Sequence, residues 1–425
     1  MSSVNSDLPP EILEKGKLAR AAALQLAQAN THQKNTALLA MGDALLNKAD
    51  KIIAANAMDV KTGLSNGLSP SLVDRLALNE KRIADMANGL KEVAGLPDPI
   101  GEVIAGWTRP NGLRIQKVRV PLGVVGIIYE ARPNVTADAA GLCLKSGNAV
   151  ILRGGKEALE SNRAIVKVMS EASTTNGMAP GMIQLIESTD RDVAAGMMRA
   201  NGLIDVLIPR GGAGLIQTVV KTATVPVIET GVGNCHLYLD ASADKKMATA
   251  ICINAKVQRP SVCNAIETLL IHEELGEDYL RELLGELDRR GVEIHGCERT
   301  VKAFPKSRPA MEADWEEEFL RLVLAVRVVK NLDEALAHIQ RYSSRHSEAI
   351  ITRDLEAAER FTHELDAAVV YVNASTRFTD GFEFGFGAEI GISTQKLHAR
   401  GPMGLRELTS IKYVVHGEGQ VRGIG

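Results

Sequence analysis

One cysteine in this chain stands in a context suited to nucleophilic catalysis. Cys263 lies in the polar turn Arg259-Pro-Ser-Val-Cys263-Asn, directly before an apolar run. Such a turn can present a thiol to a cleft, and a nearby cation favours the thiolate, which is the reactive form. A structural role fits the same position, because isolated cysteines are commonly small buried hydrophobic residues. Cys143 and Cys252, in apolar helical surroundings, are expected to be residues of that kind.

Two polar residues follow apolar runs at places where a ligand crevice is expected. Glu229 comes directly after the run 225–228, and Asn134 lies in the loop after the run 124–128. Ligands of open parallel sheets bind beyond the carboxyl ends of the strands, where a carboxylate or an amide donor could act on them. Glu229 also fits a turn or capping carboxylate, and Asn134 fits a helix N-cap.

A glycine-rich turn offers a site for phosphate. Arg210-Gly211-Gly212 follows an apolar run and opens a helical stretch, where free backbone N–H groups attract anions. Gly212-Ala-Gly214-Leu-Ile-Gln217 departs from the dinucleotide pattern G-x-G-x-x-G at its third glycine. A turn built only for packing explains these glycines as well.

The elements that must position these residues alternate between short apolar runs and helical stretches. After about a hundred helical, alanine-rich residues, the runs 124–128, 149–152, 183–186, 204–208 and 225–228 are separated by helices at 135–144, 158–172, 193–200 and 214–221. This alternation predicts βαβ units and a parallel sheet.

A second alternation begins near residue 236 and predicts a second α/β domain. Its strands are expected at 237–239, 265–271, 322–329, 349–352 and 369–372, with helices at 246–256, 275–289, 332–341 and 355–363. The near-alternation of charged and apolar residues at 114–119 predicts a projecting flap, with which the tail 411–421 could pair. The acidic run 314–318 is expected to be a solvated turn.

Composition excludes several classes of protein. The 425 residues carry 49 basic and 52 acidic side chains, a net charge of −3, so no nucleic-acid or anionic-lipid partner is indicated. No run of 18 apolar residues and no signal peptide is seen, so a cytoplasmic protein without a membrane span is expected. The five cysteines include no C-x-x-C pair, and His338 and His346 have no third ligand at suitable spacing, so no metal site is expected.

Three stretches identify a family resemblance: VKNLDEALAHIQRYSSRHSE from Val329, YVNASTRFTDG from Tyr371 and STQKLHARGPMGL from Ser393. From about residue 10 to 415 the chain resembles the gamma-glutamyl phosphate reductase branch of the aldehyde dehydrogenase superfamily. This resemblance implies an α/β fold of the aldehyde dehydrogenase type. It implies a Rossmann-type NADPH-binding domain (1–110 and 121–230), an α/β catalytic domain (231–400), and a small β-flap with a C-terminal segment for oligomerisation (111–120 and 401–425).

The resemblance also implies roles for single residues. Cys263 corresponds to the catalytic thiol, Glu229 to the characteristic glutamate and Asn134 to the oxyanion-hole asparagine. The cofactor residues implied are Arg153, Gly154, Lys156, Arg210, Gly211, Gly212 and Glu318. Arg153 stands where relatives place a lysine, and Glu318 is similar to the glutamate that holds the nicotinamide ribose. NAD-preferring relatives often have an acidic residue at the position of Lys156, and a cation there favours the 2′-phosphate of NADPH.

The implied reaction is the NADPH-dependent reduction of L-glutamate 5-phosphate to L-glutamate 5-semialdehyde and phosphate, through a cysteine thioester, in proline biosynthesis. The substrate's phosphate and carboxylate need polar partners, for which the candidates are Arg132, Lys256, Arg259, His346, Asn373, Ser375 and Arg377. A homodimer or homotetramer is expected, and glutamate 5-kinase is a candidate partner.

Three other functions stay open at this point. The presence of Glu229 permits a hydrolytic NAD(P)-dependent aldehyde dehydrogenase. A cysteine acyltransferase or hydrolase would need no nicotinamide, and a non-catalytic binding module would not need the Cys263 thiol.

Overall fold

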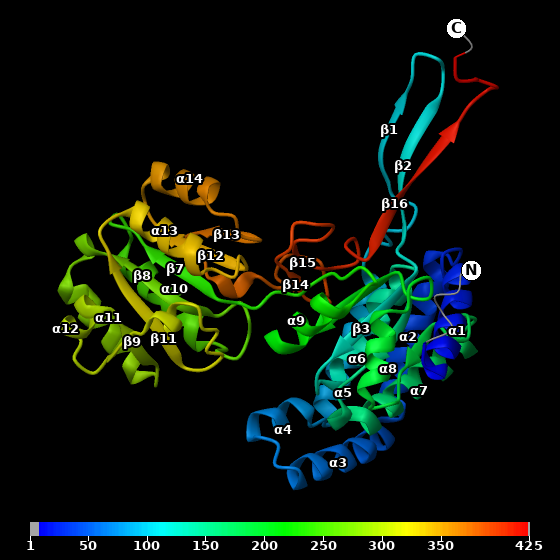
Figure 1. Ribbon diagram of the computed structural model, residues 1–425, viewed down its shortest axis with the longest axis horizontal. Helices are drawn as coiled ribbons and strands as arrows, with labels where there is room; N and C mark the ends of the chain where they lie inside the picture. Colours follow the sequence, from blue (N-terminus) through cyan, green and yellow to red (C-terminus); the bar gives the residue numbers. More distant parts are fainter. Residues whose placement is uncertain (1–7, 424–425) are drawn as a thin grey trace. The chain divides into compact units, whose positions relative to one another are not determined.

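The chain consists of two compact units in a computed structural model that describes residues 8–423 (Figure 1). The first unit contains residues 8–229, 385–391 and 403–423, and the second contains 230–384 and 392–402. The first unit thus ends its main segment one residue before the expected limit at 230. It also takes up the segment 385–391, which was expected with the second. No helix among these described residues is both long and apolar enough to cross a bilayer.

Five helices open the first unit, and their ends follow from local capping. They are α1 (Pro10–Leu26), α2 (Thr31–Asn47), α3 (Ala49–Ser65), α4 (Pro70–Leu76) and α5 (Glu80–Gly95). Asn30 forms a capping box with Gln33 at the start of α2, and Ser69 and Asn79 cap α4 and α5. Proline fills the first helical position of α1 and α4, where its missing N–H costs nothing.

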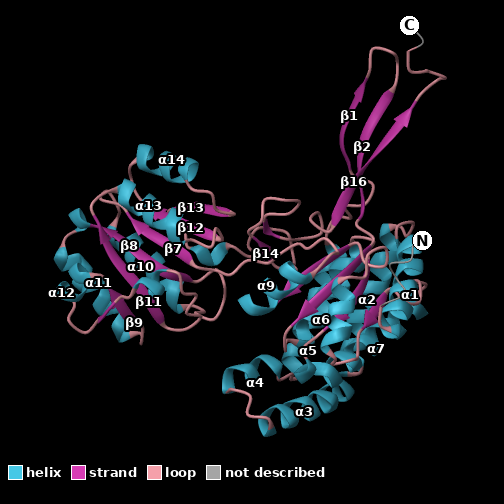
Figure 2. Cartoon of the chain, viewed as in Figure 1, coloured by secondary structure: helices cyan, strands magenta, loops and turns pink. Residues whose placement is uncertain are grey.

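The sheet of the first unit is parallel and four-stranded. Its strands are β3 (Val124–Tyr129), β4 (Ala149–Arg153), β5 (Ile183–Leu185) and β6 (Val206–Arg210), in the order β5-β4-β3-β6. The connecting helices are α6 (Pro133–Lys145), α7 (Leu159–Thr175), α8 (Arg191–Met198) and, after β6, α9 (Ala213–Thr222); η2 (Lys156–Ala158) leads into α7. This βαβ arrangement confirms the predicted alternation (Figure 2).

The expected fifth strand at 225–228 is wrong. Only Val227 forms a bridge, with Leu207 of β6, although the Ile228 N–H also donates to the Leu207 carbonyl at 2.9 Å. Pro226 has no N–H to give to a ladder, which limits the pairing to a single step. Glu229 therefore follows a short extended segment beside β6 rather than a full strand.

The predicted flap exists and has three strands. β1 (Val103–Thr108), β2 (Arg114–Pro121) and β16 (Thr409–His416) pair antiparallel in the order β1-β2-β16, and extend as an arm from the first unit (Figure 1). The tail of the chain pairs along the whole of β2, from Thr409 opposite Pro121 to His416 opposite Arg114. Trp107 and Tyr413 meet edge to face across the arm, with ring centroids 6.3 Å apart.

The second unit is built on a seven-stranded parallel sheet of order β10-β9-β11-β8-β7-β12-β13. Its strands are β7 (Cys235–Leu239), β8 (Ile266–His272), β9 (Glu293–Gly296), β10 (Arg308–Pro309), β11 (Val323–Val329), β12 (Ser347–Ile351) and β13 (Val369–Val372). The helices are α10 (Lys245–Val257), α11 (Glu277–Arg289), α12 (Glu298–Ala303), α13 (Leu332–Tyr342) and α14 (Leu355–Glu364), with short turns η3 (Glu273–Leu275), η4 (Glu312–Trp315) and η5 (Thr376–Phe378). A small hairpin of β14 (Ile392–Ser393) and β15 (Gly401–Pro402) completes the unit.

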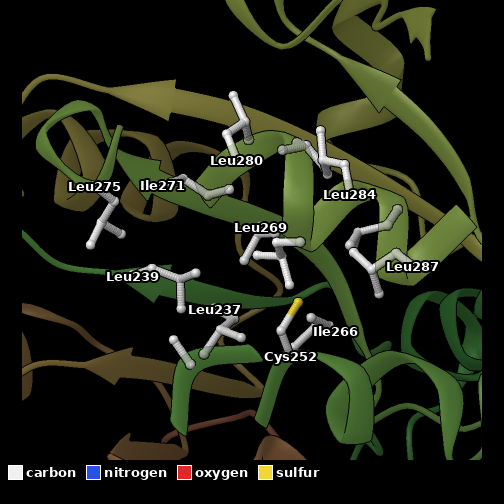
Figure 3. Close-up of a cluster of buried hydrophobic side chains, with 14 of the residues drawn as sticks. Leu237, Leu239, Cys252, Ile266, Leu269, Ile271, Leu275, Leu280, Leu284 and Leu287 are labelled. Atoms are coloured by element: carbon white, nitrogen blue, oxygen red, sulfur yellow. The ribbon is translucent and has the colours of Figure 1, made fainter. Parts of the chain in front are cut away.

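An aliphatic core joins α10 and α11 to the central strands of this sheet. Leucines and isoleucines of β7, β8 and α11 surround the Cys252 sulfur (Figure 3). Cys252 is fully buried, and burial raises the pKa of its thiol to about 12. It is thus the small apolar residue that its sequence context predicts. The strands β9 and β10 and the helix α12 were not foreseen, because they are too short to carry a periodic pattern.

Candidate active site

Cys263 lies in the turn between α10 and β8, at the carboxyl end of the helix and the start of a buried strand. All five cysteines are free thiols, and Cys143, Cys235 and Cys252 are buried, whereas Cys263 and Cys297 are partly exposed. Burial raises the pKa of the three buried thiols, which disfavours their reactive form. Among the cysteines, the partial exposure of Cys263 in a polar turn suits a nucleophile.

The loop before β7 packs directly on the Cys263 backbone. A Cβ atom on Gly233 would lie 1.6 Å from the Cys263 carbonyl oxygen, so no other residue fits at 233. The Gly233 N–H donates to Glu318 Oε1 at 2.7 Å. Burial raises the pKa of the Glu318 carboxyl, and this hydrogen bond opposes the shift. The sequence-predicted residue Glu318 is thereby connected to the Cys263 turn through one glycine.

The acidic run 314–318 is only in part the solvated turn that was expected, because Glu316 and Glu317 are exposed whereas Trp315 is buried. Trp315 is buried and packs in a cluster with Phe319, Val323 and Tyr342. Asn234 Nδ2 donates to the Trp315 carbonyl at 2.8 Å, which ties this run to the loop before β7. Glu318 is held at its place because the apolar residues on either side of it are buried.

The turn η5 is fastened to the residue that follows Cys263. Thr376 Oγ1 donates to the Asn264 carbonyl at 2.7 Å, and Asn264 Nδ2 donates to the carbonyls of Thr379 at 2.9 Å and Arg377 at 3.4 Å. Asn264, Thr376 and Thr379 are all buried. Buried polar groups that satisfy one another fix a single geometry, so η5 and the Cys263 turn form one rigid piece.

Arg377 brings a positive charge to this piece. Its Nε donates to Gln258 Oε1 at 2.9 Å. Burial lowers the pKa of Arg377 and Arg259 lowers it further, whereas Cys263 and Asp380 raise it, so these groups lie within electrostatic reach of the guanidinium. The Arg377 guanidinium is therefore within reach of both the thiol and Arg259, and a cation near a cysteine stabilises the thiolate.

A second layer of polar groups lies beneath the turn. Cys235 Sγ donates to the Cys263 carbonyl at 3.2 Å and lies 3.6 Å from His346 Nδ1. His346 Nδ1 is also 2.9 Å from Ser347 Oγ, which is 2.7 Å from Thr379 Oγ1. His346 is fully buried, and desolvation lowers its pKa to about 4. This imidazole is thus neutral at physiological pH and supports the backbone of the turn.

The structure contradicts two of the expected substrate contacts. Lys256 is fully buried and its Nζ lies 2.5 Å from Glu267 Oε2, so its charge is compensated inside the protein. His346 is likewise buried and bonded to protein groups. Both were chosen by residue type and sequence proximity, which do not show the direction of a side chain.

Two more of the expected substrate residues, Asn373 and Ser375, form hydrogen bonds with the main chain. Asn373, with φ of 58°, both accepts from and donates to the Thr352 main chain at 2.9 Å. Ser375 is buried, and its Oγ accepts from the Arg377 N–H at 3.3 Å. Of the residues expected to meet substrate in the second unit, Arg259 and Arg377 are the two whose charged groups are accessible.

In the first unit, the residues expected to hold a cofactor lie at the carboxyl ends of β4 and β6. Arg153 ends β4 and its Nη2 donates to the Asp190 carbonyl at 3.4 Å, whereas Lys156 is exposed at the start of η2. A Cβ on Gly154 would meet the Asn162 amide at 2.1 Å and the Tyr129 ring at 3.2 Å. The chain can pass this point only because 154 is a glycine.

The glycine turn after β6 opens α9, as predicted. The Gly212 N–H donates to Glu130 Oε1 at 3.0 Å, and Gly211 packs against the same side chain. Exposed N–H groups at a helix start attract anions, and a carboxylate of this chain already uses one of them. Exposed backbone N–H groups, two glycines and the nearby Arg210 fit the phosphates of a dinucleotide.

Asn134 is the second residue of α6, and the N-cap of this helix is Arg132. The interpretation of Asn134 as an N-cap is therefore wrong. The Asn134 Nδ2 donates to Asp138 Oδ2 at 3.2 Å, one turn along the helix. Burial raises the pKa of the Asp138 carboxyl to about 6, while Asn134 and Arg210 oppose the shift. Arg132 and Asn134 are exposed and Glu229 is partly buried, all three in the first unit.

Several residues at the site were not found by sequence reasoning. Gln258 and Asn264 carry no signal, since amides are common in turns. Cys235 resembles any cysteine that opens an apolar strand. Gly233, in Gly231-Val-Gly233, could have been noticed, because paired glycines before a strand often permit a close backbone approach.

Known proteins confirm the class of this fold. The family model described as the aldehyde dehydrogenase family matches residues 9–296 and 304–414. The chain therefore belongs to the aldehyde dehydrogenase family. An acetylating aldehyde dehydrogenase from Geobacillus thermoglucosidasius, 18% identical with a TM-score of 0.68, covers 97% of this chain and 98% of its own and shares the fold.

Similarity to one branch of the family is much stronger. A gamma-glutamyl phosphate reductase of Moorella thermoacetica is 62% identical over 97% of this chain and 99% of its own length. The crystal structure of gamma-glutamyl phosphate reductase from Thermotoga maritima is 52% identical and covers 97% of this chain and all of its own, with a TM-score of 0.95. The chain is an oxidoreductase of this branch, and the family implies a nicotinamide cofactor.

Proposed function

We propose that this protein reduces L-glutamate 5-phosphate to L-glutamate 5-semialdehyde and phosphate with NADPH, the second step of proline biosynthesis from glutamate. The observation that carries the proposal is the Cys263 turn, where a partly exposed thiol lies within electrostatic reach of Arg377. A nucleophile beside cations suits an acyl donor whose leaving group is an anion. The names of the relatives support the same substrate.

The first step is attack by the Cys263 thiolate on the acyl carbon. A C–S bond forms, the bond between that carbon and the phosphate oxygen breaks, and phosphate leaves with its electron pair. Arg259 and Arg377 stabilise the departing charge, since a guanidinium binds phosphate oxygens through two parallel N–H bonds. The product on the enzyme is a thioester of Cys263.

The carbonyl oxygen gains negative charge in this step and again when the thioester is reduced. The Asn134 Nδ2–H and the Cys263 backbone N–H are the donors that we assign to this oxyanion. Each such donor is worth about 2.7–4 kcal/mol in comparable sites. Collapse of the resulting thiohemiacetal breaks the C–S bond, releases the aldehyde and regenerates the thiolate.

The residues of the first unit fit a nicotinamide dinucleotide. Arg210, Gly211 and Gly212 would hold phosphate, Arg153 and Gly154 the adenosine end, and Glu318 of the second unit the nicotinamide ribose. Lys156 is exposed and would pair with the 2′-phosphate of NADPH, which supports this cofactor over NADH. When bound, the reduced nicotinamide supplies the hydride.

A hydrolytic aldehyde dehydrogenase is the alternative that Glu229 permits. Reduction of an acyl phosphate needs no activated water, so in the proposed reaction Glu229 shapes its surroundings without acting as a base. The names of the highly similar relatives favour the reductive route.

The flap supports an assembly of identical chains. Val103, Ile104, Trp107, Tyr413 and Val415 are exposed on its strands, and exposed apolar side chains gathered on one small sheet are typical of a subunit interface. We propose a homodimer or homotetramer that works in the cytoplasm and receives its labile substrate from glutamate 5-kinase.

The test is the reverse reaction, measured as NADPH formation from L-glutamate 5-semialdehyde and NADP⁺. We expect steady turnover only when phosphate is present, and loss of turnover in Cys263→Ser. Equal turnover without phosphate would instead establish the hydrolytic route. In the forward direction, coupling to glutamate 5-kinase should consume NADPH.

A further inference from the structure

Arg377 is held by a residue to which no role has been given. The Arg377 Nε donates to Oε1 of Gln258, the exposed residue that caps the carboxyl end of α10, at 2.9 Å. Among the described residues, 8–423, the Arg377 guanidinium makes this one hydrogen bond. Its two terminal nitrogens therefore keep their N–H groups for a ligand, and these are the atoms that bind an oxyanion in the bidentate way.

The main chain of Arg377 is fixed as well. Asn264 fixes the backbone of η5. Its Nδ2 donates to the carbonyls of Arg377 and Thr379, and its own carbonyl accepts from the Thr376 hydroxyl. Arg377 is thus held at both ends by residues that flank Cys263: Gln258 before it and Asn264 after it. A long side chain fixed in this way loses little entropy on binding a ligand.

The charges around Arg377 indicate what that ligand is. Arg259 and Cys263 lie within electrostatic reach of its guanidinium, as does one acidic group, Asp380. Asp380 Oδ1 accepts from the Phe382 N–H at 2.9 Å, so it is engaged with its own turn. Two neighbouring guanidiniums, one of them within reach of the thiol, suit a ligand with more than one negative charge. In an acyl phosphate that group is bonded to the carbon that the thiol attacks. The substrate's α-carboxylate carries a single charge at the far end of the glutamyl chain.

We infer that Gln258 is a positioning residue that orients the two terminal nitrogens of the Arg377 guanidinium toward the phosphoryl group of the acyl phosphate, with Arg259 as the second cation. This inference rests on the proposed function. In the reverse direction the same site orients inorganic phosphate: an oxygen of phosphate attacks the Cys263 thioester, the C–S bond breaks, and the thiolate leaves with the electron pair.

The reverse reaction separates the phosphate site from the rest of the substrate, because phosphate and aldehyde are then varied independently. In Gln258→Ala we expect KM for phosphate to rise about tenfold, the typical cost of a lost hydrogen bond to a charged group, while KM for the semialdehyde stays within twofold. Gln258→Met, of similar length but without the amide oxygen, should behave like the alanine variant. The control is Gln340→Ala, an exposed helical glutamine of the same unit, which should match wild type.

A single-turnover measurement distinguishes this inference from the proposed function. Mixed with semialdehyde and NADP⁺ in the absence of phosphate, wild type and Gln258→Ala should both form about one NADPH per active site, because formation of the thioester needs no phosphate. Absence of that burst in wild type would overturn the proposed function and the inference with it. A normal burst in Gln258→Ala with an unchanged phosphate KM, or a rise confined to the semialdehyde KM, would overturn the inference alone. Wild-type behaviour of Gln258→Met would also overturn it, since the effect in Gln258→Ala would then come from packing.

Discussion

The Cys263 turn and the glycine loops of the first unit are proposed to bind the two reactants, substrate and cofactor, yet they are built differently. Asn264, Thr376, Thr379, Cys235 and His346 are buried around the turn and bond its backbone. The glycine loop at 211–212 is exposed, and the exposed carboxylate of Glu130 accepts one of its N–H groups. Chemistry at a covalent centre needs fixed atoms, whereas a cofactor that leaves after each turnover needs groups that exchange partners at low cost.

This difference predicts that changes around Cys263 act on the rate of reaction, while changes at the glycine loops act on cofactor affinity. The variants below test that division, beginning with the change expected to have the largest effect.

Cys263→Ser should lower kcat by about 10⁴-fold or more, as the loss of a covalent nucleophile does in other enzymes. The melting temperature should stay within about 2 °C of wild type because the side chain is partly exposed and the change is small. Cys297→Ser is the matched control: Cys297 is also partly exposed in the second unit, at the N-cap of α12, where serine is favourable. Activity in the control variant close to that of Cys263→Ser would contradict the assignment of the nucleophile.

Gly233→Ala should lower kcat about a hundredfold, because the new methyl group must displace the Cys263 carbonyl by more than a bond length and a small misplacement of reacting groups is costly. The KM for NADPH should change less than kcat, since the glycine loops of the first unit are untouched and only the contact between Gly233 and Glu318 is disturbed. Gly285→Ala in α11 is the control: its Cβ meets only the end of the Arg289 side chain, at 3.8 Å, and alanine should stabilise the helix by about 0.5–1 kcal/mol. Full activity in Gly233→Ala would show that the turn is not rigid.

His346 should make the second unit sensitive to acid. Burial lowers its pKa to about 4, below the value of about 6.5 in an unfolded chain, so the unfolded state binds a proton that the folded state rejects. Stability is therefore lost as pH falls from 6.5 towards 4. Between pH 7 and pH 4.5 the free energy of unfolding should fall by about 2 kcal/mol less in His346→Asn than in wild type. Urea unfolding at each pH measures this difference. His363→Asn, an exposed histidine of α14, should follow the wild-type curve; equal curves for all three proteins would contradict a buried neutral imidazole.

The sequence allowed the fold and the type of chemistry to be predicted, because both depend on local patterns. In the two βαβ alternations most strands and helices were placed to within two or three residues, whereas the helices of the first hundred residues were predicted only as one helical region. Cys263 and the glycine turn at 211–212 were selected as candidates because a thiol in a polar turn and glycines at a helix start have recognisable surroundings, but their assigned roles come from the family resemblance and stay predictions. The failure at 225–228 has a local cause as well, since Pro226 interrupts the pairing that its apolar neighbours suggest.

The orientation of polar side chains could not be predicted, because it depends on residues far apart in the chain. Lys256 is only seven residues before Cys263 in the sequence, but Glu267 on the next strand neutralises it inside the core. The role proposed for Gln258 depends on its hydrogen bond with Arg377, more than a hundred residues further along the chain. A single sequence carries no record of such pairings, so these contacts had to come from the structure.

Lys156→Glu should exchange cofactor preference without affecting the covalent step. A carboxylate in place of the exposed ammonium should raise KM for NADPH about tenfold, by loss of a charged contact to the 2′-phosphate, and lower it for NADH. The kcat at saturating NADPH should be retained. Lys167→Glu makes the same change of charge at an exposed position of α7, and should leave the ratio of the two KM values unaltered. Equal weakening by both variants would mean that overall charge, not position 156, attracts the cofactor.

Glu130→Gln should have the smallest effect, a tightening of NADPH binding. The Glu130 carboxylate accepts the Gly212 N–H at the start of α9, where a phosphate of the cofactor is proposed to bind, so the two anions compete for one donor and repel each other. A neutral amide should lower the dissociation constant about threefold, in line with the energy of one charge at a helix end, and the gain should shrink at high salt. Glu171→Gln, an exposed glutamate of α7, gives the control for net charge. Weaker binding by Glu130→Gln would reverse the interpretation, because Glu130 would then be holding the Gly211–Gly212 turn in the shape that the cofactor needs.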